Sequence, residues 1–88
     1  MAEEIKTQVE YYLSDKNLSG DKFFHTEISK DTEGWLPLSL IMNCGKIKAL
    51  TTEQAKVVSA IEESKEVEVS EDKSKIRRTG NKALPELK

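Results

Sequence analysis

A strip of polar and aromatic side chains near the N-terminus carries functional groups that can hold an unpaired nucleotide base. The strip consists of Gln8, Tyr11, Tyr12 and Asp15. Their i, i+3, i+4, i+7 spacing places the four side chains on one face of a helix. These residues supply an amide, two phenols and a carboxylate, which can stack on bases and hydrogen-bond to their edges. The alternative is that both tyrosines pack at the rim of a core, as aromatic pairs at helical spacing commonly do.

A helix over residues 2–14 would present this strip. One apolar arc at helical spacing is formed by Ile5, Val9, Tyr12 and Leu13. Residues 15–20 are rich in turn-forming types, so we expect the helix to break there, with Leu18 directed into the core.

A second helix is predicted to run from Asp21 to about residue 30, because Asp21 stands where an N-cap belongs. Phe24 and Ile28 are four residues apart and form its buried stripe. Phe23 lies about 100° away around the helix axis and therefore points towards a different neighbour.

The rest of the chain predicts two further helices and a small sheet. Residues 31–34 form a loop, residues 35–36 are extended, and a third helix begins near Pro37 and loosens at residues 43–45. Thr51 and Gln54 have capping-box spacing, with Leu50 and Ala55 as the staple, ahead of a fourth helix to about residue 65. Residues 67–69 and 76–78 form a hairpin. The predicted core of this half contains Trp35, Leu38, Leu40, Ile41, Met42, Ile47, Leu50, Val57, Val58 and Ile61.

This order of elements predicts an α+β fold of the winged-helix type: helices, a short strand, more helices and a closing β-hairpin wing. In DNA-binding winged helices the helix before the hairpin enters the major groove. That helix is net acidic in this chain, since its charged residues are Glu53, Lys56, Glu62, Glu63 and Lys65. Duplex DNA is therefore not the expected partner.

Charge and composition exclude further kinds of binding partner. The chain has 88 residues, enough for one domain, and a net charge of −2. Residues 1–34 hold eight acidic side chains against four lysines, which argues against binding driven mainly by phosphate neutralisation. No apolar run approaches a membrane span, so no membrane partner is expected.

Reactive side chains are few. Cys44 is the single cysteine, which excludes an internal disulfide, and His25 is the single histidine, so no metal site or other cofactor is expected. The two residues come with no nucleophile–base framework, and we therefore expect a binding module rather than an enzyme.

Several separated motifs in the chain resemble the La motif, the RNA 3′-end-binding module of La and La-related proteins. The resemblance covers nearly the whole chain in one order, and it includes the segments at residues 8–18, 21–24, 33–38, 50–52 and 70–78. The last of these, with residues 82–86, is more similar to genuine La than to the wider related families. The elaborated winged helix of that family agrees with the pattern of elements.

The resemblance implies a role for each residue of the RNA site. Gln8 matches the amide that contacts a uracil edge, Tyr11 and Tyr12 match the aromatic and hydroxyl contacts, and Phe23 matches the stacking ring. Asp21 matches the carboxylate that accepts hydrogen bonds from both hydroxyls of the last ribose, with plain N-capping as the alternative.

At other positions of the motif, the resemblance leaves the role of the residue open. Asp15 and Asn17 match signature positions, with structural roles in the loop as the alternative, and His25 stands where a longer basic side chain is common. Five cations have two interpretations. They form a solvated face, or they make secondary contacts with RNA phosphates upstream of the 3′ end; the residues are Lys46, Lys73, Lys75, Arg77 and Arg78.

One position departs from the family. Its members usually carry Phe-Asn where this chain has Cys44-Gly45, and no aromatic residue follows Trp35 to replace the ring. Stacking is worth ~1–3 kcal/mol per base, so the change weakens the expected affinity for uridine. Neighbouring Asn43 is a candidate substitute for the missing amide.

By resemblance, the expected function is recognition of the free 3′ oligouridine end of nascent small RNA polymerase III transcripts, which protects them from exonucleases and assists their maturation. The expected organisation is a monomeric domain over residues 1–79 and an exit linker over residues 80–88, leading to an RNA-recognition motif outside this chain. The expected location is nuclear, with shuttling to the cytoplasm. The alternatives are a protein-interaction winged helix with a weakened RNA pocket, and a binder of adenosine-rich tails.

Overall fold

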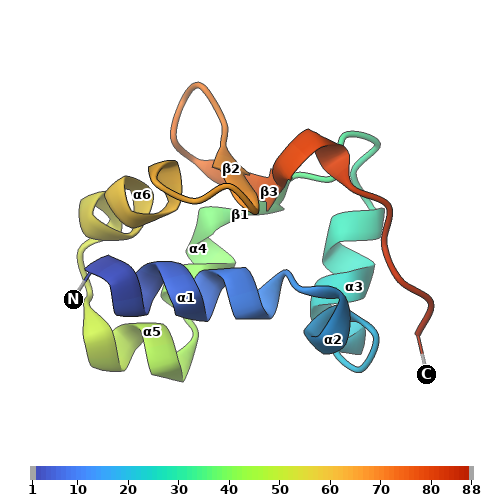
Figure 1. Cartoon of the computed structure of the whole chain (residues 1–88), viewed down its shortest axis with the longest axis horizontal. Coiled ribbons are helices and arrows are strands. Elements are labelled where there is room, and N and C mark those ends of the chain that lie inside the picture. Colours follow the sequence, from blue (N-terminus) through green and yellow to red (C-terminus); the bar gives the residue numbers. More distant parts are fainter. Residues whose placement is uncertain (1, 88) are drawn as a thin grey trace.

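The computed structural model describes residues 2–87, in which six α-helices pack with a three-stranded sheet that lies along one side of the domain (top of Figure 1). The elements in order are α1 (Ala2–Tyr12), α2 (Asp15–Leu18), α3 (Lys22–Ser29), β1 (Leu36–Pro37), α4 (Leu38–Met42), α5 (Gly45–Leu50), α6 (Gln54–Glu62), β2 (Val67–Val69), β3 (Lys75–Arg78) and the 3-10 turn η1 (Thr79–Asn81). The predicted α+β class and the closing hairpin are confirmed. Met1 and Lys88, the outer ends of the two predicted segments, lie outside the described residues.

The sheet is antiparallel, with strand order β1-β3-β2. Ile76 of β3 pairs with Leu36 on one side and Val69 on the other. Leu36 and Ile76 are fully buried, because one face of this narrow sheet covers the helical core. The loop between β2 and β3 projects from the body of the domain as the wing (Figure 1).

Helix α1 crosses the middle of the molecule and contacts both α6 and α5 (Figure 1). Its apolar arc faces inwards, as the spacing predicts: Ile5, Val9 and Leu13 are buried. The strip at Gln8 and Tyr12 is half-buried at the edge of this packing. No helix within residues 2–87 combines the length and apolar character needed to cross a bilayer.

The chain between α1 and α3 is more helical than predicted. Helix α1 ends at Tyr12 instead of residue 14, and residues 15–18 form a helical turn, α2, where we expected only a loop. The cause is local capping, because Ser14 Oγ accepts the backbone N–H of Asn17 at 3.2 Å and starts a new turn. Leu18 is buried, as expected.

The stretch from residue 43 to residue 65 also differs from expectation. Gly45 opens α5, a helix that the sequence reading missed, because a helix of six residues leaves little periodicity to detect. The predicted capping box is wrong: α6 begins only at Gln54, and Thr51 Oγ1 accepts the N–H of Glu53 instead. Helix α6 also ends at Glu62, earlier than predicted. Five predicted core residues are only partly buried, namely Trp35, Leu40, Met42, Leu50 and Val58.

Residues 79–87 lie along the domain. Arg78 Nη1 donates to the carbonyl of Ala83 at 3.0 Å, and His25 Nε2 lies 2.8 Å from the carbonyl oxygen of Pro85. Leu84 packs against the core. Figure 1 shows this segment descending beside α3. It therefore covers one side of α2 and α3, while its predicted role as a linker to a further domain stays a prediction.

Candidate nucleic-acid interface

Asp21 begins the helix that carries the aromatic part of the site. Its Oδ1 atom accepts the backbone N–H of Phe24 at 3.0 Å, so the predicted N-cap is confirmed. Its Oδ2 atom has one long contact, 3.5 Å from Asn17 Nδ2. One carboxylate oxygen is thus used by the cap, and the other retains capacity to accept hydrogen bonds.

Three aromatic rings follow one another across α1 and α3. The ring of Phe24 lies 5.5 Å, between centroids, from both Tyr12 and Phe23. Phe24 is buried, whereas Phe23 is 56% exposed. Phe24 therefore supports the other two rings, and Phe23 offers an open face on which a base can stack.

The phenol of Tyr12 is close to the polar groups of the site. Burial, and then the neighbouring thiol of Cys44, raises the pKa of Tyr12, while a hydrogen bond with Gln8 opposes the rise and the Asp21 carboxylate adds to it. Burial also raises the pKa of Cys44. These effects on the pKa of Tyr12 indicate that Gln8, Asp21 and Cys44 lie near its phenol. We call the surface formed by Gln8, Tyr12, Asp21 and Phe23 the α1–α3 surface.

Two residues of the predicted set line a different depression, although the ring of Tyr11 also lies 6.4 Å, between centroids, from that of Tyr12. Tyr11 lines a separate depression together with Arg78 and Lys82. Asp15 forms an ion pair with Arg78, and hydrogen bonding from that guanidinium lowers the pKa of the carboxyl below its ordinary value. Lys82 adds a longer contact, with Nζ 3.7 Å from Asp15 Oδ2.

Asn17 and His25 are already engaged by the protein. The side-chain amide of Asn17 donates to the carbonyl of Tyr12 at 2.9 Å and so connects α2 to the end of α1. The half-buried ring of His25 is within hydrogen-bonding distance of the Pro85 carbonyl. Asn17 borders the α1–α3 surface, 3.5 Å from Asp21 Oδ2, whereas the ring of His25 contacts the C-terminal segment.

The cations of the wing do not all form a solvated face. Lys73 pairs with Glu62, and Lys75 is exposed. Arg77 lies over the ring of Trp35, with its guanidinium carbon 4.3 Å from the ring centroid, and it also pairs with Glu68. Arg78 is only 4% exposed, so the expectation that it is a solvated group is wrong. It is buried because β3 turns it towards α2.

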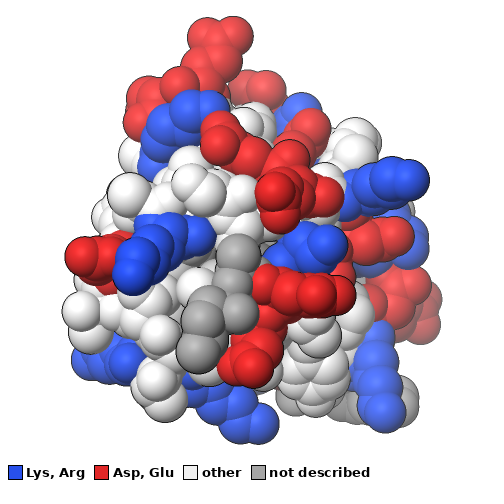
Figure 2. Space-filling view, turned by 60° about the vertical axis from the view of Figure 1, so that its left-hand side comes forward, with Lys and Arg blue, Asp and Glu red and all other residues white. Residues whose placement is uncertain are grey.

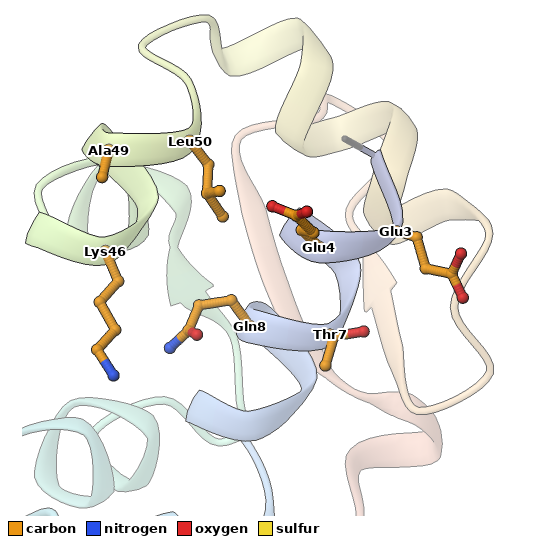
Figure 3. Close-up of a pocket in the computed structure, with 7 residues that line it drawn as sticks. All are labelled: Glu3, Glu4, Thr7, Gln8, Lys46, Ala49 and Leu50. Carbon is orange, nitrogen blue, oxygen red and sulfur yellow. The ribbon is translucent and has the colours of Figure 1, made fainter.

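A groove between α1 and α5 continues from Gln8. Its volume is about 620 Å³, and it is lined by Glu3, Glu4, Thr7, Gln8, Lys46, Ala49 and Leu50. In Figure 3, Gln8 and Leu50 point into the space between the two helices, and Lys46 lies at its edge. The sequence reading missed the apolar wall of Ala49 and Leu50, although their i, i+3, i+4 spacing from Lys46 was a usable signal.

Charges do not assemble into a broad basic surface on the face shown in Figure 2, where Lys and Arg are interspersed with Asp and Glu. Among residues 2–87, no three His, Cys, Asp or Glu side chains come close enough to hold a metal ion. The side chains of the α1–α3 surface itself supply an aromatic ring, a phenol, an amide and one carboxylate, which are groups for stacking and hydrogen bonding.

Helices packed on a three-stranded antiparallel sheet, with an exposed aromatic and a carboxylate outside the wing, define a winged-helix-like domain with a surface suited to unpaired nucleotides. The model of the La domain family matches residues 5–63, and the chain belongs to this family of RNA-binding domains. The chain is 42% identical to the La protein homolog of Drosophila melanogaster over 93% of its length, and 44% identical to the Lupus La protein homolog of Mus musculus over 96%. It spans about a fifth of the length of these relatives.

Solved structures agree with this assignment. A structure of the La autoantigen N-terminal domain superposes with a TM-score of 0.88 at 31% identity, covering 96% of this chain and 89% of the other. The La motif of the Dictyostelium discoideum La protein gives a TM-score of 0.76 at 33% identity, covering 97% and 91%. The winged-helix-like fold predicted from the order of elements is confirmed.

Proposed function

We propose that this domain binds the 3′ end of single-stranded RNA, with oligouridine bearing a free 3′ hydroxyl as its preferred ligand. One observation carries the proposal: Asp21 caps α3 through Oδ1 and keeps Oδ2 for a ligand, at the start of the helix whose buried Phe24 ring adjoins both Tyr12 and the exposed Phe23 ring. A carboxylate accepts hydrogen bonds from a terminal diol and repels a terminal phosphate. Because one of those hydroxyls is the 2′-OH, the same contact favours RNA over DNA.

The other residues of the surface supply base recognition. Phe23 stacks on a base, and the amide of Gln8 can donate to and accept from a uracil edge. Tyr12 contributes its hydroxyl in the neutral state, because the pKa of this phenol is raised, chiefly by burial. Cys44 stands next to that hydroxyl in place of an aromatic ring, so we expect weaker stacking than in relatives that have the ring.

The proposed consequence is protection of the 3′ ends of nascent small transcripts from exonucleases, mainly in the nucleus, by a protein of which this chain is one module. Residues 1–79 form the RNA-binding domain of this proposal, and the chain continues towards an RNA-recognition motif that completes the grip on the tail. The isolated domain acts as a monomer and binds weakly. The length of the curated relatives, about five times that of this chain, supports the proposal of further domains.

The test is a titration of the domain with short oligouridine RNA that ends in either a 3′ hydroxyl or a 3′ phosphate, followed by amide-resolved NMR. We expect tighter binding of the hydroxyl form, with shifts at Gln8, Tyr12, Asp21 and Phe23. Equal affinity for both ends would contradict end recognition. An unshifted spectrum at millimolar RNA would contradict RNA binding by this surface.

Asp21→Asn sharpens the test, since asparagine caps a helix as well as aspartate but has no charge. The variant should keep its fold and lose the preference for the hydroxyl end. Asp31→Asn is the matched control: Asp31 Oδ2 also accepts backbone amides, those of Glu33 and Trp35, but it lies beyond the other end of α3. That control should bind as the parent domain does.

An adenosine-rich tail is the second candidate ligand. A side chain added at Gly45 would meet nothing within 4 Å, so the position next to Cys44 is open and can admit a larger base. Oligoadenosine with a 3′ hydroxyl is therefore the third RNA in the titration. Tighter binding of oligoadenosine than of oligouridine would favour this candidate.

A further inference from the structure

Arg78 is the one buried charged residue within the described part of the chain. It ends β3, and its guanidinium donates to the carboxylate of Asp15 and, at 3.0 Å through Nη1, to the carbonyl of Ala83. A buried guanidinium is tolerated only where its donors are used, and the fork of arginine allows both bonds at once. The end of the wing is thereby joined to α2.

Helix α2 needs such support because it has only four residues. One helical turn fixes several backbone dihedrals for a single hydrogen bond and is unstable alone. Its position is set by the cap at Ser14, by buried Leu18 and by the Asp15–Arg78 pair. The ion pair is the one of these three contacts that comes from the opposite end of the sequence.

Helix α2 in turn holds two residues of the α1–α3 surface. The side chain of Asn17 donates to the Tyr12 carbonyl at 2.9 Å and lies 3.5 Å from Asp21 Oδ2, the oxygen that the cap leaves free. The carbonyl of Asn17 also accepts the backbone N–H of Asp21 at 2.8 Å. A rotation of α2 would therefore move the carboxylate relative to the phenol.

We propose that Arg78 is a positioning residue for RNA 3′-end recognition: through Asp15 it holds α2 in the orientation in which Asn17 aligns Asp21 with Tyr12. The inference rests on the proposed function, since it concerns the same surface. Arg78 is not proposed as an RNA contact, because it is only 4% exposed and its guanidinium already bonds to Asp15 and Ala83.

A double-mutant cycle tests the inference with Arg78→Met, Asp15→Ala and both together, each titrated with the hydroxyl-ended and phosphate-ended oligouridines. Each single variant should weaken binding of the hydroxyl end by about tenfold, within the range for side chains of one hydrogen-bond network. The preference over the phosphate end should shrink, and the double variant should be no weaker than the weaker single one. A merely structural role would lower stability and leave this preference unchanged.

The matched control removes an exposed ion pair at the start of α6, through Glu53→Gln with Lys56→Met; the Nζ–Oε2 distance of this pair is 3.1 Å. It should change neither affinity nor preference. If Arg78→Met does not fold, Asp15→Ala decides alone, because Asp15 is 58% exposed. An unchanged preference in folded Asp15→Ala, or additive losses in the cycle, would overturn the inference.

The spectra of the RNA-free variants separate this inference from the proposed function. The amides of Asn17 and Asp21 should shift in Asp15→Ala and stay in place in the α6 control. If the parent domain shows no end preference, the proposed function fails, and these shifts still decide whether Arg78 positions Asp21. Unmoved amides would overturn the positioning role whatever RNA is bound.

Discussion

Asp21 and Phe24 are joined by a capping hydrogen bond of 3.0 Å that uses only one of the two carboxylate oxygens of Asp21. The bond fixes the start of α3, and with it the position of the Phe24 ring under Tyr12 and Phe23. The second oxygen has one long contact, 3.5 Å from Asn17 Nδ2. Capping and ligand binding, which are alternatives for this residue in the sequence, are thus compatible in the structure.

The first prediction separates the two roles of Asp21 by stability. Asp21→Ala should lower the free energy of unfolding by about 1 kcal/mol through loss of the cap, whereas Asp21→Asn should change it little. Urea denaturation followed by far-ultraviolet circular dichroism measures both. Equal destabilisation by the two substitutions would show that the charge, and not the cap, stabilises α3.

The two neighbouring phenylalanines should behave oppositely. Phe23→Ala should weaken oligouridine binding by ~1–3 kcal/mol and leave stability nearly unchanged, because the ring is 56% exposed. Phe24→Ala should lower the free energy of unfolding by about 3–5 kcal/mol, because its ring is buried. Calorimetric titration and thermal unfolding give the two quantities. An unchanged affinity in Phe23→Ala would exclude this ring as the stacking platform.

Two glycines should respond differently to alanine. Gly45→Ala should stabilise the domain by ~0.4–1 kcal/mol, because Gly45 has a helical backbone and open space around it. Gly34→Ala should destabilise it, since Gly34 has φ +78° and the new Cβ would collide with Asn81 Oδ1. The melting temperatures of the two variants and of the parent domain test both expectations. A loss of stability in Gly45→Ala would mean that α5 requires glycine at its first residue.

Asp72 in the wing should contribute to the loss of folding stability at low pH. Hydrogen bonds from Ser70 and Ser74 lower the pKa of Asp72 to about 2. A depressed folded-state pKa stabilises the fold above the unfolded value of about 3.9, and this contribution is lost as the pH falls towards 2. Urea midpoints between pH 5 and pH 2 should therefore fall less steeply in Asp72→Asn than in the parent domain. Parallel profiles would contradict the assignment.

Cys44 reports on occupancy of the site. Burial raises the pKa of its thiol, so alkylation by iodoacetamide at pH 8 should be slower than for a free thiol. Because Cys44 neighbours Tyr12, saturating oligouridine should slow the reaction further. Mass spectrometry follows the modified fraction with time. An RNA-independent rate would place the bound RNA away from Cys44.

Local patterns were sufficient to predict much of the fold. The apolar arc of α1, the cap at Asp21 and the extended backbone of β2 depend on neighbours within a few residues, and each is confirmed. Helices α2 and α5 were missed because short helices are stabilised by caps and packing more than by their own periodicity. The capping box at Thr51 failed for the converse reason, since matching residue types were present without the required backbone geometry.

For the site, residue types and spacing along α1 and α3 specified which chemistry is present: an amide, a phenol, a carboxylate and an exposed ring. Which of these groups meet depended on contacts between residues distant in sequence. Arg78 lies 63 residues from Asp15, and in pairing with it Arg78 becomes buried, although the sequence placed Arg78 among solvated charges. Burial of a charge is a property of the folded surroundings, and only the tertiary structure decides whether a cation faces RNA or holds a helix in place.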